Sequence, residues 1–506
     1  MPNQQSNQQS TNPLQVPGSG ARTMALVAAL LGWLFDGFEM GLFPVVARPA
    51  VMELLGDQAS DALFGRWYGV ITAAFLVGAA TGGVLFGWLG DRVGRIRAMT
   101  LSILTYAIVS ALGAFAQQPW HLMVVRFLAA LGMGGEWSLG VALVMEIWQG
   151  RSRGLLAGLI GAAGNLGYVV VALLSLFLVQ VQAVLGSFLT AIHIPQAWID
   201  QLAANSGWRM LMLMGILPAL LTLGIRFFVP ESQSWKEENT KGTTKGWATK
   251  DLLGILVGSV ACFGILALWA NDVDWAVRIV GTAGCLGVVT IGYLWPIRSY
   301  LARNDETPAF RRDTMSMMLI AAGLSGVALL GTWGSVLWSA PWADKLSDML
   351  PGAKQWTQFW SAMGATLGCL VAALLGERFS RRWTYASLLV ISLGSAQLFF
   401  RTNETWSSWF FVSVFFVGAC TASFYGWLPL YLPELFPTRV RATGQGFGFN
   451  FGRILAAIGA LQTGALMDGV FKGDYGRACA AISFIYLAGF LLLPLMRETH
   501  GKPLPD

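Results

Sequence analysis

The 506-residue chain has few charged residues. Asp, Glu, Lys and Arg make up 12% of it, about half the share that a soluble domain carries. Hydrophobic residues make up 55%, and they gather in runs long enough to cross the roughly 30 Å apolar core of a bilayer. This composition excludes an ordinary soluble domain and predicts an integral membrane protein that is surrounded by lipid.

Histidine and cysteine are also scarce. None of the three histidines, His121, His193 and His500, falls in the middle of an apolar run. The five cysteines lie in or beside apolar runs without the spacing of metal ligands, so neither disulfides nor a zinc site is indicated. No metal or other cofactor is expected. A membrane transferase would need a His or Cys nucleophile or a carboxylate cluster at one face, and since neither is evident we do not expect an enzyme.

The net charge of +6 does not indicate nucleic-acid binding, because the basic residues lie in short loops between apolar segments rather than in one patch. Residues 1–23 are predicted to be a disordered cytoplasmic tail. Met1–Ala21 are rich in Gln, Asn, Ser and Pro and carry no charged side chain, whereas a cleaved signal peptide would need a basic start and an apolar centre.

Fourteen apolar stretches are long enough to span a membrane. Six lie in the first half, at about 24–47, 64–86, 98–117, 120–145, 153–180 and 207–228. Two follow the charged linker Gln233–Lys250, at about 251–270 and 275–297, and six more lie at about 315–340, 357–376, 383–400, 408–432, 442–466 and 477–496. Residues 181–206 form an unusually long outer loop with room for a short amphipathic helix.

The predicted fold is therefore all-α, with two six-helix bundles and an inserted central helix pair. We assign residues 24–229 to the first bundle, 230–314 to the linker and the helix pair, 315–497 to the second bundle and 498–506 to a cytoplasmic tail. With both termini inside, 22 of the 33 basic residues fall on the cytoplasmic side and 9 outside, as the positive-inside rule requires. This orientation predicts a multi-pass protein of the cell inner (plasma) membrane.

The loop Gly87–Arg97, G-W-L-G-D-R-V-G-R-I-R, places charged residues and glycines between two apolar runs. It resembles the short loop between the second and third helices of the major facilitator superfamily, G-x-x-x-D-R-x-G-R-[RK]. An ordinary positive-inside loop would explain its arginines, but not Asp91 with the spaced glycines. The resemblance implies a transporter of that superfamily.

An internal repeat supports the same layout. The spacing of Glu146, Arg151 and Arg153 recurs at Glu434, Arg439 and Arg441, 288 residues later. Parallel halves of this kind hold a substrate site at mid-membrane that is exposed to each side in turn. We interpret the matched residues, together with three from the first loop, as gating latches at the cytoplasmic helix ends: Asp91, Arg92, Arg95, Glu146, Arg151, Arg153, Glu434, Arg439 and Arg441. A snorkelled loop charge is the alternative for any one of them.

Charged residues deep in the spans are candidates for the transport site, because such charges are costly in a membrane. Asp36 lies about 18 Å beyond Met24 at 1.5 Å per residue, and Glu39 is three residues further. Arg126 descends about 9 Å from Trp120 in the opposite direction, so it can pair with Asp36 or with Glu39. A buried network that only joins helices is the alternative.

Asp36, Glu39 and Arg126 are predicted to couple transport to protons. With no histidine at mid-membrane, a proton carrier must be a carboxyl group. Burial disfavours the charged form of a carboxyl group and a neighbouring guanidinium favours it, so movement of Arg126 would switch either acid between holding and releasing a proton. Sodium coupling stays open, since a buried acid pair can hold either ion.

Arg453 is predicted to bind a substrate carboxylate. It lies twelve residues beyond Arg441, again about 18 Å deep, and its planar fork of donors suits a carboxylate. Asn165, 288 residues earlier, aligns with it and offers a neutral polar contact. Asn450, Tyr168 and Trp333 complete the predicted substrate contacts, although packing alone would account for the aromatic residues. Glu136 falls closer to the cytoplasmic face, where gating or packing is as reasonable as binding.

Further motifs narrow the resemblance. Asp36-Gly37-Phe38-Glu39 resembles the D-G-F-D of proton-coupled organic-acid symporters, and Gly132–Trp137 resembles their G-M-x-G-E-[YW]. The segment Arg497–Pro505 is similar to the tail of sugar-porter-like members. The inserted helix pair resembles the fourteen-span bacterial sialic acid symporters. These likenesses imply a monomeric proton symporter for a small organic acid, with sialic acid first and another monocarboxylate or aromatic acid second; a sugar transporter or a transporter-like nutrient sensor is the alternative.

Overall fold

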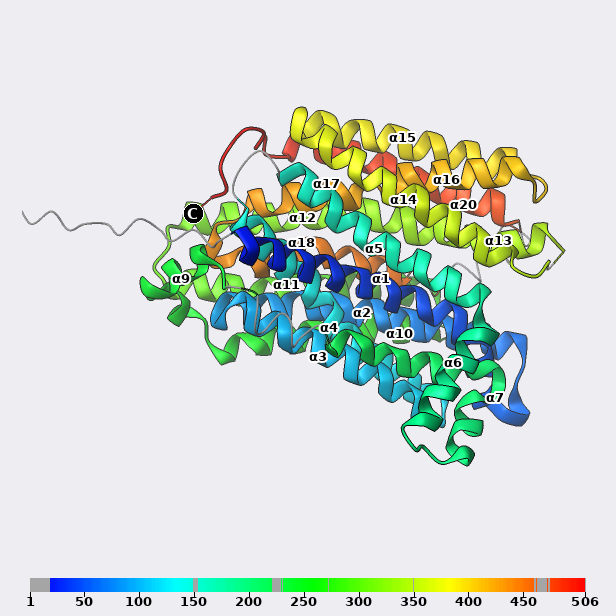
Figure 1. Cartoon of the computed structure of the whole chain (residues 1–506). Coiled ribbons are helices and arrows are strands. Elements are labelled where there is room, and N and C mark those ends of the chain that lie inside the picture. Colours follow the sequence, from blue (N-terminus) through cyan, green and yellow to red (C-terminus); the bar gives the residue numbers. More distant parts are fainter. Residues whose placement is uncertain are drawn as a thin grey trace, which may run out of the picture.

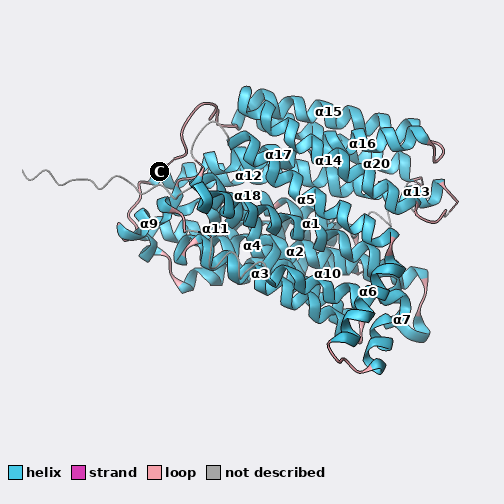
Figure 2. Ribbon diagram, in the orientation of Figure 1, coloured by secondary structure: helices cyan, strands magenta, loops and turns pink. Residues whose placement is uncertain are grey.

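The computed structural model describes residues 19–148, 153–220, 229, 231–271, 273–348, 350–458, 461, 471 and 474–505. In these ranges the regular elements are all helices, as Figure 2 shows. Twelve helices in the described part are long and apolar enough to cross a membrane. Two other predicted spans, 207–228 and 442–466, include residues outside the described ranges, so the count of fourteen stays a prediction. The all-α membrane fold is confirmed.

The first bundle contains α1 (Ser19–Leu55), α2 (Asp61–Val93), α3 (Arg95–Leu112), α4 (Pro119–Ile147) and α5 (Arg153–Leu176). Local sequence sets several of the boundaries. The Ser60 side chain accepts a hydrogen bond from the Leu63 amide and caps α2. Gly94 has φ +111°, a conformation that favours glycine, and it separates α2 from α3. Pro119 occupies the first turn of α4, where its missing N–H is not needed.

The long loop predicted at 181–206 contains two helices, α6 (Leu178–Ala191) and α7 (Gln196–Leu213). Residues 204–207 have non-helical backbone angles, so α7 is interrupted there. Figure 1 shows α6 and α7 at one end of the molecule, together with α13 (Ser339–Leu346). We call this the open end, and the opposite end, where Asp91 and Arg441 lie, the motif end.

The insertion consists of α9 (Gln233–Thr240), α10 (Leu252–Ala270) and α11 (Trp275–Arg303). Helices α10 and α11 pack on each other and against α2 of the first bundle. Their contact with α2 is partly polar, because the Tyr293 hydroxyl lies 2.7 Å from Thr81 Oγ1 and Ser259 donates to the same oxygen at 3.3 Å. In a bilayer these hydroxyl groups have no water to bond with, so their mutual hydrogen bonds favour docking of the pair.

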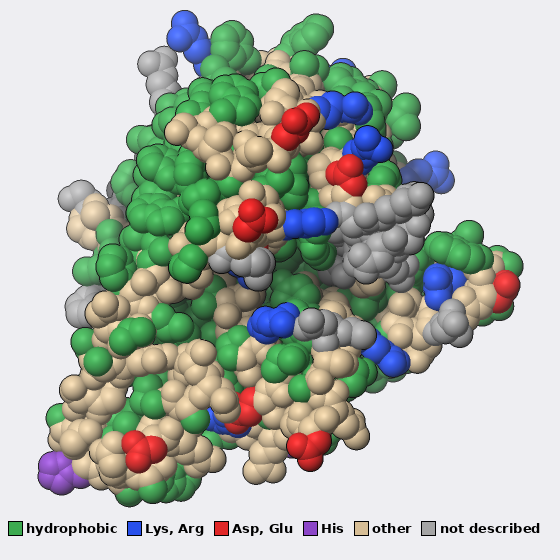
Figure 3. Space-filling view, turned by 90° about the vertical axis from the view of Figure 1, so that its right-hand side faces the viewer, with side chains coloured by type: hydrophobic (Ala, Val, Ile, Leu, Met, Phe, Trp, Pro, Cys, Tyr) green, Lys and Arg blue, Asp and Glu red, His purple; other side chains and the backbone are tan. Residues whose placement is uncertain are grey.

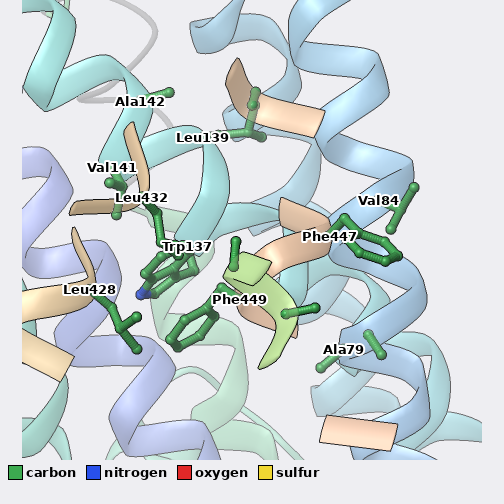
Figure 4. Packing of buried hydrophobic residues seen from close by; sticks show 14 of the residues in the cluster. Ala79, Val84, Trp137, Leu139, Val141, Ala142, Leu428, Leu432, Phe447 and Phe449 are labelled. Carbon is green, nitrogen blue, oxygen red and sulfur yellow. The ribbon is translucent and has the colours of Figure 1, made fainter. Parts of the chain in front are cut away.

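The second bundle begins with α12 (Pro308–Gly334), α13 and α14 (Ala353–Arg378). It continues with α15 (Arg381–Thr402), α16 (Ser408–Ala422), α17 (Phe424–Tyr431), α18 (Arg441–Asn450) and α20 (Tyr475–Ser483). The two bundles meet along α2 with α18 and along α5 with α14. Glycine allows the close approach of α2 and α18, since a Cβ atom at Gly446 would overlap the Gly83 carbonyl. Figure 4 shows the nearby packing, in which the Trp137 and Phe449 rings stack with centroids 3.7 Å apart.

Candidate functional site

A cavity of about 220 Å³ lies between the two bundles. Its lining comes from α1, α2, α4 and α5 on one side and from α12 to α14 and α16 to α18 on the other. It extends toward the open end as far as Pro341 and Lys354. Figure 3 views this end and shows a hollow with hydrophobic side chains inside and basic side chains at its rim. The charged residues in the lining are Asp36, Lys354 and Arg453.

Arg453 follows α18 in the helical residues 452–458 and is 6% exposed. Its guanidinium carbon lies 5.5 Å from the centre of the Phe449 ring. Two of its nitrogens, Nε and Nη1, have no hydrogen-bond partner in the described part of the protein. Buried donors without acceptors are costly, so this site favours a ligand that supplies acceptor oxygens.

Asp36 lines the same cavity, and its carboxyl group contacts that of Glu136. Glu136 does not line the cavity but lies behind Asp36, near the Tyr106 hydroxyl. Gly32 makes room for it, since a Cβ atom there would overlap Glu136 Oε1. Glu136 is eleven residues from the Ile147 end of α4 and seventeen from the Pro119 end; its proximity to Asp36 was not predicted.

Glu39 and Arg126 form an ion pair away from the cavity. Ser110 also donates to the same Glu39 oxygen. The Arg126 guanidinium lies 4.3 Å from the centre of the Phe75 ring, and both members of the pair are almost fully buried. The sequence left both Asp36 and Glu39 open as partners of Arg126. In the structure Arg126 pairs with Glu39, whereas Asp36 lines the same cavity as Arg453.

Three of the other predicted substrate contacts, Asn165, Tyr168 and Trp333, line the cavity. The Asn165 amide donates to the Gly161 carbonyl at 2.9 Å and lies 3.5 Å from Cys369 Sγ, so it joins α5 to α14. Asn450 does not line the cavity. Its amide donates to the Gly446 and Gly134 carbonyls, at 3.0 and 3.3 Å, and so it packs α18 against α4 instead.

Aromatic side chains form much of the remaining wall. They include Trp33, Trp137, Tyr168, Trp333, Tyr425 and Phe449. The Trp33 indole nitrogen and the Tyr425 hydroxyl have no hydrogen-bond partner in the described ranges. The cavity therefore combines flat apolar faces with a few donors and one deep guanidinium, which suits a small planar anion.

The motif end is closed by a buried network that crosses between the bundles. Asp91 accepts hydrogen bonds from the Thr443 amide at 2.9 Å and the Thr443 hydroxyl at 2.6 Å. It also pairs with Arg95 at 2.5 Å. Glu146 pairs with Arg95 at 3.1 Å and with Arg441 of the second bundle at 2.9 Å. These contacts hold the two bundles together at the end farthest from the cavity mouth.

Other predicted latch residues make different contacts. Glu434 pairs with Arg381 at 2.8 Å and more distantly, at 3.9 Å, with Arg153. Arg381, which lies 286 residues after Arg95 in a looser repeat of the first loop, was not among the predicted latch residues. Two further arginines reach the insertion and its connection to α12: Arg92 donates to Thr249 at 3.1 Å, and Arg439 pairs with Glu306 at 2.5 Å. Arg151 lies outside the described residues.

The C-terminal residues lie over this network. Arg153 donates to the Lys502 carbonyl at 3.0 Å, and Arg441 donates to the Pro505 carbonyl at 2.5 Å. Glu498 anchors the segment: burial alone would raise its pKa, but hydrogen bonds from the Ser380 hydroxyl and nearby backbone amides outweigh burial and lower the pKa to about 2. The segment thus contacts residues of both bundles.

Comparisons with known proteins agree with this architecture. The family model described as "Sugar (and other) transporter" matches residues 24–249 and 344–500. The sialic acid transporter NanX of Escherichia coli is 25% identical, covering 94% of this chain and 94% of that protein. The cis,cis-muconate transport protein of Acinetobacter baylyi is 23% identical, covering 98% and 99%. The solved proton:xylose symporter XylE is 18% identical, with a TM-score of 0.65 and coverage of 96% and 98%.

Proposed function

Because the chain belongs to the sugar (and other) transporter family of the major facilitator superfamily, we propose that it imports a small carboxylated metabolite together with a proton. The family and the relatives are membrane transporters, so this chain is a transporter rather than an enzyme. In the proposal it works as a monomer in the cell inner membrane, with the motif end in the cytoplasm.

One observation carries the choice of an acid as cargo. Arg453 is a buried cation in the cavity wall, and two of its nitrogens have no partner in the described ranges. A carboxylate oxygen accepts strong, charge-assisted hydrogen bonds from guanidinium nitrogens. Binding of an acid would therefore relieve the cost of the buried charge, which a neutral cargo would not do.

Asp36 is the proposed link between cargo and proton. The positive charge of Arg453 acts on Asp36 across the cavity, and it favours the charged carboxylate. When a substrate carboxylate neutralises Arg453, that support is withdrawn and Asp36 takes up a proton. Glu136, in contact with Asp36, adds to the effect because two adjacent buried carboxyl groups do not readily carry charge together. Glu39 and Arg126 form the second proton-coupling pair of the proposal.

Alternating access would require the motif end to open. The cavity in this structure reaches the open end, while Asp91, Glu146 and Arg441 hold the motif end shut. We propose that loaded substrate and proton favour the opposite arrangement, in which these bonds between the bundles separate. The gating roles of the remaining latch residues belong to the same proposal.

Sialic acid is the first candidate cargo because of the helix pair and the likeness to NanX. The aromatic wall, however, favours the second candidate, a planar aromatic or conjugated acid, since flat rings pack well against such a molecule. A sugar is less well supported, because it makes no use of the charge of the deep guanidinium, and a sensor function is distinguished from transport by the uptake measurement.

Uptake into proteoliposomes under an imposed pH gradient tests the proposal. Labelled N-acetylneuraminate, benzoate and xylose would be compared with and without the gradient. We expect acid uptake driven by the gradient, with Arg453→Gln raising KM for the acid far more than for any neutral compound. Arg453→Lys is the matched control for charge. Acid transport that is indifferent to Arg453→Gln, or that still follows the gradient fully in Asp36→Asn with Glu39→Gln, would overturn the assignment.

A further inference from the structure

We propose that Lys354 forms an outer anion site at the mouth of the cavity, where a substrate carboxylate is held before it reaches Arg453. The inference rests on the proposed function, because it takes the cargo to be an acid. Lys354 is the second residue of α14 and, with Arg453, one of two basic residues in the described lining. It is partly exposed, whereas Arg453 is buried.

The cavity face of α14 connects the two depths. Lys354, Gln358, Ser361 and Ala365 all line the cavity, and their spacing of four, three and four residues places them on one helical stripe. The inner end of the stripe is marked by Cys369, which lies 3.5 Å from Asn165. Lys354 is fifteen residues before Cys369, or about 22 Å along the helix.

The two cations come from different helices and differ in exposure, which suits two successive sites. Lys354 is in the first turn of α14 and partly exposed, whereas Arg453 is buried and acts on Asp36 and Tyr425, so in the proposal one carboxylate meets Lys354 first and Arg453 second. Gln358, one turn inward from Lys354, supplies an amide donor on the way. The polar stripe therefore gives an anion a path from the mouth to the floor of the cavity.

The charges around the mouth support this role. The charged groups that act on Lys354 are Asp344, on α13, and Arg48, on α1 of the first bundle. Asp344 and Arg48 are not among the lining residues, whereas Lys354 is. Lys354 is thus the member of this group whose charge faces the cavity, and a local positive charge raises the concentration of anions near it.

A structural explanation competes with this one. Lys354 and Asp344 attract each other, and that attraction alone would hold α13 against α14. The two explanations predict opposite effects of Asp344→Asn on anion binding at the mouth. If the pair is structural, Asp344→Asn and Lys354→Gln both weaken the packing of α13 against α14, and both change anion access in the same direction. If Lys354 receives anions, removal of the competing carboxylate in Asp344→Asn strengthens the site while Lys354→Gln weakens it.

A charge-selective labelling experiment separates them without any need for transport. Gln358→Cys is introduced into the full-length protein, and its reaction rates with anionic and cationic methanethiosulfonate reagents are measured; the parent chain is the blank for its native cysteines. We expect Lys354→Gln to lower the anionic-to-cationic rate ratio by about threefold to tenfold, and Asp344→Asn to raise it. Added salt should shrink both effects. Arg401→Gln, an exposed charge at the end of α15, should change nothing.

An unchanged ratio in Lys354→Gln, or a lowered ratio in Asp344→Asn, would overturn the outer site. Uptake measurements then separate this proposal from the general one. We expect Lys354→Gln to raise KM for an acid with little change in kcat, and Lys354→Arg to restore it. If Arg453→Gln impairs acid uptake and Lys354→Gln does not, the proposal of an outer site is wrong, but the proposed function is supported. If Arg453→Gln has no effect, it is the proposed function that fails.

Discussion

Replacement of Thr443 by valine tests the closure of the motif end most directly. The Thr443 hydroxyl donates to Asp91 across the bundle interface at 2.6 Å, and the side chain is fully buried. Valine has nearly the same shape, so the change removes one hydrogen bond to a charged group and little else. Asp91 keeps the Thr443 backbone amide, at 2.9 Å, and Arg95, at 2.5 Å.

A hydrogen bond to a charged group contributes about 1.5–3 kcal/mol. Because this bond joins the two bundles, its loss destabilises the state in which the motif end is closed. The open fraction should therefore rise by about tenfold to hundredfold. Ser138 offers a place to measure it, since its side chain is fully buried and its carbonyl accepts from Gln445 of the second bundle.

The assay is the rate at which a maleimide reagent modifies a cysteine placed at Ser138. We expect Thr443→Val to accelerate the modification and to leave the thermal stability nearly intact. Thr314→Val is the matched control, because the Thr314 hydroxyl bonds only to Phe310 within its own helix. Equal rates for Thr443→Val and Thr314→Val would refute the idea that the Asp91 contact sets the closed state.

Three further changes have defined outcomes. Gly32→Ala should push Glu136 away from Asp36 and reduce proton-driven accumulation more than passive exchange of substrate, as measured by uptake and counterflow. Tyr293→Phe removes the bond to Thr81 and should cost about 0.5–1.5 kcal/mol, seen as a lower Tm with transport retained. The Glu498 pKa is lowered from 4.5 to about 2, so its contribution to tail docking is present above pH 4.5 and is lost as the pH falls toward 2. Protection of the tail from protease should show the same pH dependence. Glu498→Gln should lack both the protection and its pH dependence.

Helix geometry explains why the floor of the cavity was predictable. Arg453 and Asn165 each lie twelve residues beyond an arginine of the repeated motif, Arg441 and Arg153. A rise of 1.5 Å per residue puts both at the same depth, and both line the cavity. The repeat thus predicted a shared level in two bundles without any knowledge of their packing.

Glu136 shows what the same count missed. Its depth was measured from the outer end of its span, but α4 is 29 residues long and exceeds the thickness of the membrane core. Counted from the other end, Ile147, Glu136 lies eleven residues in, or about 16 Å. That is close to the depth of Asp36, and the count from both ends would have revealed the pair.

The choice between Asp36 and Glu39 was beyond the sequence for a different reason. The two side chains are three residues apart and so point only about 60° apart around α1. Which one faces the cavity depends on how α1 is rotated, and close packing fixes that rotation: a Cβ atom at Gly37 would overlap the Gly164 carbonyl of α5. Such tertiary contacts are not visible in the hydrophobic pattern.

The connection between α11 and α12 has a mechanical consequence. Only residues 304–307 separate the two helices, and Asp305 has a left-handed φ of 52°. Helix α11 is fastened to the first bundle through Tyr293 and Thr81, while α12 belongs to the second. A rotation of one bundle against the other must therefore be taken up in these four residues or in the docking of α11 and α10 on α2, so the short connection couples the movement of the helix pair to that of the second bundle.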